Sequence, residues 1–90
     1  MKNNDKIENR DIEIKLKSEI EKWKNKIEEE LNNLNKENQK ENKKEILKDI
    51  RAYIEDSKYF YNKGDLIRAF EAIIWAWALF EISFKRSYSA

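Results

Sequence analysis

The most constraining feature of this sequence is the run from Ala52 to Glu81, which contains the only glycine of the chain, Gly64. A glycine between two apolar, helix-periodic segments is typical of a left-handed helix C-cap. Asp65 follows directly, and an aspartate here can accept hydrogen bonds from the free amides that open the next helix. The run therefore predicts a tight antiparallel helical hairpin that turns at Gly64 and Asp65.

The composition extends this prediction to the whole chain. Ninety residues suit one small domain. Proline is absent and 41% of the residues are charged, which favours long helices and disfavours a turn-rich β sandwich or barrel. We expect an all-α fold, a three-helix up-and-down bundle with a long first helix and a tight hairpin between the second and third.

Apolar residues at helical spacing place the three helices at about residues 11–35, 43–63 and 66–85. Residues 1–10 are expected to be frayed, and Asn35 to Asn42, which contains no apolar residue, is expected to be the connecting loop. A capping box of Ser18 and Glu21 offers a later start for the first helix. Its apolar seam consists of Leu16, Ile20, Trp23, Ile27, Leu31 and Leu34.

The third helix is apolar almost all round. At about 100° per residue, one face forms a core that packs on the second helix. That face comprises Leu66, Ala69, Phe70, Ile73, Ala76, Trp77, Phe80 and Phe84. The small Ala69 and Ala76, together with Gly64 and Asp65, are expected to hold the hairpin closely packed.

Opposite this core, Trp75, Leu79 and Ile82 line up beside Ala78. A row of large apolar side chains away from the core has two explanations: burial under the first helix, or a surface for self-association or another protein. Because three helices do not easily surround one of their own members, we predict an interface at these four positions.

The charge balance argues against a nucleic-acid or membrane partner. The 19 basic and 18 acidic residues nearly cancel, giving a formal net charge of +1. The alternative hypothesis, a nucleic-acid accessory protein, would use Arg68, Lys85 and Arg86. The one strongly apolar run, Ala72 to Phe80, is far shorter than the roughly 20 residues that span a bilayer, so no membrane partner is expected.

The sequence contains few of the residue types that catalysis and cofactor binding usually require. Histidine and cysteine are absent, which removes the commonest general base, thiol nucleophiles and most transition-metal ligands. A carboxylate site for a hard cation would have to use Glu55, Asp56, Asp65 and Glu71, which lie on differing faces. We therefore expect no enzyme activity, cofactor, metal or small-molecule substrate. We also expect no secretory signal and a cytoplasmic location.

A spaced pattern in the hairpin resembles a known family. The residues that carry it are Tyr53, Asp56, Ser57, Tyr59, Phe60, Gly64, Asp65, Ala69 and Ala76. In this order and spacing they resemble the archaeal domain of unknown function 357 family, over roughly Lys22 to Ile82. The resemblance implies a compact three-helix up-and-down bundle and an archaeal source, with no activity to transfer. The chain departs from the family at Ala78 and Leu79, where glycine and tryptophan are usual.

These observations predict a non-enzymatic helical interaction module. It would act as a homodimer, or as a subunit that docks on another protein through the third helix, with Trp75 as the anchor. Tryptophan is enriched among the residues that dominate the binding energy of protein interfaces.

Overall fold

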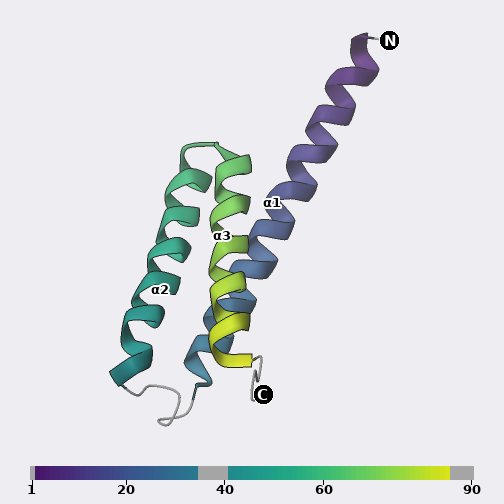
Figure 1. Cartoon of the computed structure of the whole chain (residues 1–90). Helices are drawn as coiled ribbons and strands as arrows, with labels where there is room; N and C mark the ends of the chain where they lie inside the picture. Colours follow the sequence, from purple (N-terminus) through teal and green to yellow (C-terminus); the bar gives the residue numbers. More distant parts are fainter. Residues whose placement is uncertain (1, 35–40, 86–90) are drawn as a thin grey trace.

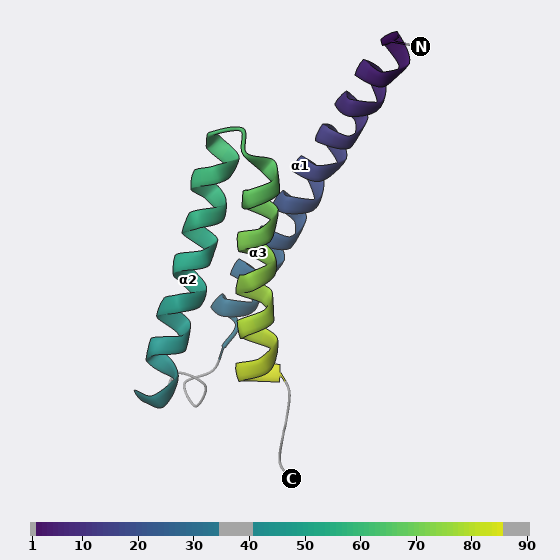
Figure 2. The ribbon, with the colours of Figure 1, turned by 45° about the horizontal axis from the view of Figure 1, so that its top comes forward.

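The computed structural model describes residues 2–34 and 41–85, with the side chains of residues 10–34 and 43–85. These residues form α1 (Lys2–Asn32), α2 (Glu41–Asn62), α3 (Leu66–Phe80) and a terminal π-helical turn, η2 (Glu81–Lys85). α2 runs opposite to α1 and α3, and α1 crosses the α2/α3 hairpin at an angle (Figures 1 and 2). The predicted all-α, three-helix up-and-down bundle is confirmed.

The first helix begins earlier than the sequence pattern indicated. α1 starts at Lys2 and ends at Asn32, so the segment expected to be frayed is helical from residue 2, and the later start at Ser18 is wrong. Residues 2–32 contain no proline or glycine that would stop a helix. The N-terminal part of α1 extends beyond the hairpin (Figure 1). Ile12 and Ile14, in this part of the helix, are each 61% exposed.

The other boundaries shift by smaller amounts. α2 begins at Glu41 and ends at Asn62, so the expected loop is shorter than predicted, and residues 35–40 lie outside the described part. α3 starts at Leu66, as expected, and its α-helical bonding ends at Phe80. Residues Glu81–Lys85 continue it as a π turn, which sequence periodicity does not distinguish from an α turn.

The turn between α2 and α3 has the predicted chemistry. Gly64 has a φ of +80°, its amide donates to the Tyr61 carbonyl at 3.0 Å, and the Asp65 amide donates to the Phe60 carbonyl at 2.9 Å. These two bonds form a Schellman motif. The Asp65 carboxylate then accepts from the Arg68 amide at 3.2 Å, which caps α3.

We expect Gly64→Ala to lower the free energy of unfolding by about 1 kcal/mol, because a Cβ disfavours positive φ. The added Cβ would meet no atom within 4 Å, so the cost is confined to the backbone. Urea denaturation measures it, and Gly64→Asn, which tolerates this conformation better, should cost less. An alanine variant as stable as the wild type would contradict this account.

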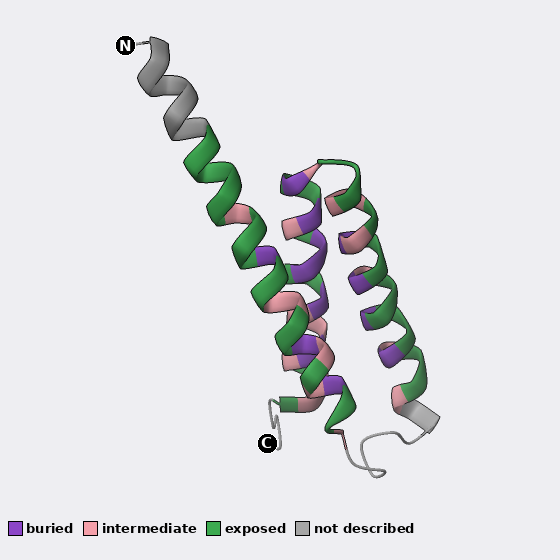
Figure 3. Cartoon of the chain, turned by 180° about the vertical axis from the view of Figure 1, so that it is seen from behind, coloured by how far each residue is buried: buried purple, intermediate pink, exposed green. Residues whose placement is uncertain are grey.

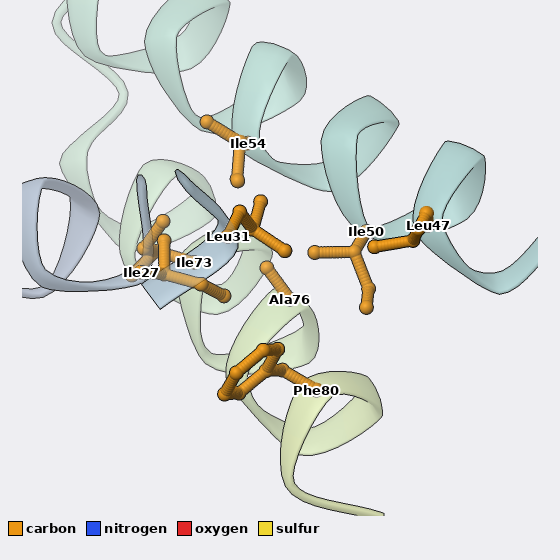
Figure 4. Packing of buried hydrophobic residues seen from close by; sticks show 8 residues of the cluster. All are labelled: Ile27, Leu31, Leu47, Ile50, Ile54, Ile73, Ala76 and Phe80. Carbon is orange, nitrogen blue, oxygen red and sulfur yellow. The ribbon is translucent and has the colours of Figure 1, made fainter. Parts of the chain in front are cut away.

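α2 and α3 pack closely through small residues. Ala69, Ala76 and Ser57 have no exposed surface, and the Ser57 hydroxyl donates to the Ala69 carbonyl at 2.7 Å. Hydrogen bonding of this kind satisfies a hydroxyl that would otherwise be costly to bury. The main core beside this contact joins all three helices (Figure 4). It consists of Ile27, Leu31, Leu47, Ile50, Ile54, Ile73, Ala76 and Phe80.

α1 docks on the hairpin through the C-terminal part of its seam. Ile20, Ile27 and Leu31 are buried, and the buried positions of all three helices face inward (Figure 3). The Trp77 indole N–H donates to the Trp23 carbonyl at 3.0 Å, and the two indole rings meet edge to face with centroids 5.7 Å apart. α1 therefore occupies the Trp77 side of α3.

Candidate interaction surface on α3

The position of α1 leaves one side of α3 uncovered. Trp75 is 58% exposed and Ile82 54%, while Ala78 is half-buried between them. Ile67 and Ile74 are exposed on the same side, at 71% and 45%. We call these five residues, Ile67, Ile74, Trp75, Ala78 and Ile82, the outer face of α3. Burial under α1, the other explanation for this row, does not occur for Trp75.

The outer face differs in part from the sequence prediction. Leu79 is half-buried and packs against the main core, because it lies nearer to the buried side of α3 than Trp75 does. Ile67 and Ile74 were missed. Ile67, Glu71, Ile74 and Ala78 follow one another at steps of four, three and four residues, which places them on one side of a helix, and this spacing could have identified both isoleucines. The sequence did not show which flank of α3 the first helix would cover.

On the α2 edge of the outer face, Trp75 stacks on Tyr53. The ring centroids are 6.3 Å apart and the planes are inclined by 21°. A shallow hollow of about 270 Å³ continues from this pair toward the turn, lined by Tyr53, Asp56, Phe60, Arg68, Glu71, Ala72 and Trp75. Offset stacking restrains both rings, so Trp75 is held in position although more than half of it is exposed.

On the α1 edge, a second hollow of about 330 Å³ is lined by Trp23, Ile74, Trp77, Ala78 and Glu81. The ammonium groups of Lys22 and Lys26 lie 5.1 and 5.0 Å from the centroid of the Trp23 ring, within the range of a cation–π interaction. The outer face is therefore bordered on both sides by aromatic rings.

The basic residues of the alternative hypothesis are not brought together. Arg68 pairs with Asp65 at 3.6 Å, and Lys85 pairs with Glu30 at 3.2 Å. The two lie at opposite ends of the α3–η2 segment, roughly 25 Å apart at the helical rise per residue, and Arg86 lies outside the described residues. Arg68 and Lys85 are thus each offset by a carboxylate, and their arrangement gives no support to nucleic-acid binding.

The carboxylates also remain separate. Within residues 10–34 and 43–85, no group of three acidic side chains is placed to hold a metal ion. Asp65 caps α3 and Glu55 pairs with Lys58 at 3.2 Å, so two of the four acidic residues considered have structural roles. Asp56 and Glu71 are exposed.

A further cavity of about 290 Å³ lies between α1 and α2, lined by Ile20, Glu21, Lys24, Asn25, Ser57, Lys58, Tyr61 and Asn62. From this lining Tyr61 and Lys58 of α2 each bond a carboxylate of α1. The Tyr61 hydroxyl donates to the Glu21 carboxylate, which raises the pKa of Tyr61. Hydrogen bonds to Glu28 and Glu55 raise the pKa of Lys58. The bonds from Tyr61 to Glu21 and from Lys58 to Glu28 tie α2 to α1.

The fold and this surface define a small helical bundle whose third helix exposes apolar side chains. Residues 22–85 match the model of a family described as protein of unknown function (DUF357), and the chain belongs to that family. The match includes residues 22–32 of α1 and all of α2, α3 and η2. No curated protein and no solved structure shows significant similarity to the chain. None of the helices in the described ranges has the length and apolar content to cross a membrane.

Proposed function

We propose that this protein is a non-enzymatic interaction module that binds a protein partner through the outer face of α3. The observation that carries the proposal is the exposure of Ile67, Ile74, Trp75 and Ile82 on one side of a helix whose other side already fills the core. Large apolar side chains exposed together on one side of a helix, rather than scattered singly, mark interaction surfaces in soluble proteins.

Trp75 is the proposed anchor. Its indole gives the largest apolar area on the outer face, and fully burying a side chain of this size is worth roughly 2–3 kcal/mol. Stacking on Tyr53 fixes the ring before a partner arrives, which reduces the entropy lost on binding. The absence of histidine and cysteine from the sequence agrees with a binding role rather than a catalytic one.

Replacing Trp75 with glutamate tests the proposal. We expect Trp75→Glu to keep the bundle folded, with a loss of about 1 kcal/mol or less from the stacked pair, and to abolish the partner complex. Circular dichroism melts give the stability. Pull-downs from the native host compare the proteins that bind the wild type with those that bind Trp75→Glu, and mass spectrometry identifies them. A protein that binds the wild type and not the variant supports the proposal.

The matched control is Trp77→Glu. Trp77 is half-buried, packs against the main core and donates to the Trp23 carbonyl, so a carboxylate there should lower the melting temperature strongly. If Trp75→Glu unfolds the protein as Trp77→Glu does, Trp75 belongs to the core and the outer face is not a binding surface.

A further inference from the structure

The hollow between α2 and α3 lies between two aromatic contacts that join these helices. At one end Tyr53 stacks on Trp75, with ring centroids 6.3 Å apart. At the other end the guanidinium carbon of Arg68 lies 5.8 Å from the centroid of the Phe60 ring. Each helix advances seven residues between the two contacts, about 10 Å along its axis. Ala72 lines this interval, and its small side chain leaves about 270 Å³ open between the two contacts.

Two carboxylates line the same hollow, one from each helix. Asp56 comes from α2 and Glu71 from α3. Both are exposed, and no hydrogen bond or ion pair links either side chain to another of the described residues. Arg68, the cation among the lining residues, pairs with Asp65 at 3.6 Å. The hollow therefore combines aromatic ends with two carboxylates that are unpaired within the described part of the chain.

We infer that this hollow receives an arginine side chain of the protein partner that binds the outer face. The inference rests on the proposed function and states what the partner carries at the α2 edge of that face. A guanidinium group has five N–H donors in a planar fork, so a single group can bond carboxylates from both helices. Its plane also packs on aromatic rings, and the contact between Arg68 and Phe60 is an example of this packing within the chain.

The position of the hollow favours such an ion pair. Trp75 belongs both to the outer face and to the lining of the hollow, so a partner that covers Trp75 also covers the hollow. Ion pairs strengthen where water is excluded. A volume of about 270 Å³ is just below the range of small-molecule pockets, which suits a single long side chain. Lysine fits less well, because its ammonium group is a point charge without a planar face.

The chemistry of the hollow is tested with N-acetyl-arginine amide as the probe. Nuclear magnetic resonance follows the indole N–H signal of Trp75, which is assigned by its loss in Trp75→Phe. At low salt we expect a saturable shift with half-saturation at roughly 1–50 mM, since one side chain alone binds weakly. The neutral isostere N-acetyl-citrulline amide should give no saturable shift, and N-acetyl-lysine amide a weaker one than arginine. Equal responses to the three probes overturn the proposal.

The double variant Asp56→Asn/Glu71→Gln removes both charges with little change in shape. Because both side chains are exposed and unbonded within the described residues, its melting temperature should stay within about 3 °C of the wild type. We expect the half-saturating concentration of N-acetyl-arginine amide to rise at least about fivefold. The matched control is Glu45→Gln/Asp49→Asn, which removes two charges from exposed positions of α2 outside the hollow. If the control weakens binding as much, only the net charge matters and the site at the hollow is wrong.

Pull-downs with these baits separate this inference from the proposed function. When the probe binds as expected, a partner that is lost with Trp75→Glu and with Asp56→Asn/Glu71→Gln, but kept by the control variant, supports both. A partner lost with Trp75→Glu and fully kept by the double variant leaves the outer face as a binding surface and overturns the arginine site. If Trp75→Glu loses no partner, the proposed function fails, and the partner is overturned as the source of the arginine whatever the probe shows.

Discussion

Ile27→Asp is expected to unfold most of the protein at 25 °C. Ile27 has no exposed surface and lies where α1 meets residues of both α2 and α3 in the main core. Losing its apolar burial costs roughly 2–3 kcal/mol, and an unpaired buried carboxylate adds several kcal/mol more. A 90-residue domain has a total stability of only about 5–13 kcal/mol.

The matched control for this substitution is Ile12→Asp in the same helix. Ile12 is 61% exposed on the part of α1 that continues beyond the hairpin, so the same change there should alter the free energy of unfolding by less than about 0.5 kcal/mol. Far-ultraviolet circular dichroism and urea titration measure both variants. If Ile27→Asp were to melt like the wild type, α1 would not be held against the hairpin at this point.

The parts of the fold that the sequence predicted are those decided by local chemistry. The hairpin turn follows from one glycine that allows positive φ and one aspartate that caps the next helix, and both act within a few residues. The buried seam of α1 was readable for the same reason, since Ile20, Ile27 and Leu31 recur at a spacing that only a helix brings onto one side. The all-α fold follows from the same periodicity.

The parts that escaped prediction depend on tertiary packing or on signals that are absent. No proline or glycine near residue 2 marks where α1 begins, and the possible capping box of Ser18 and Glu21 pointed to a later start. The prediction for the outer face of α3 included the half-buried Leu79 and missed the exposed Ile67 and Ile74, because the path of α1 decides which flank is covered. That path depends on how Trp23 and Trp77 pack, which periodicity alone does not give.

The buried surface of α3 is best tested by Phe80→Ala. Phe80 is 1% exposed, and its ring packs against those of Trp77 and Phe84, with centroids 5.8 and 5.5 Å away. Truncation to alanine removes the ring's burial and leaves a cavity that the three helices fill only in part, so we expect a loss of about 3–5 kcal/mol in the free energy of unfolding. That is a large share of the stability available to a chain of this size.

Phe84→Ala is the control that distinguishes burial from ring contact. Phe84 belongs to the same aromatic group but lies in the terminal π turn and is only half-buried, so its truncation leaves a space that opens to solvent and should cost less than half as much as Phe80→Ala. Urea titration of both variants gives the two free energies, and unchanged slopes would show that each unfolds from the same native state. Equal losses would mean that the π turn is as much a part of the core as α3 itself.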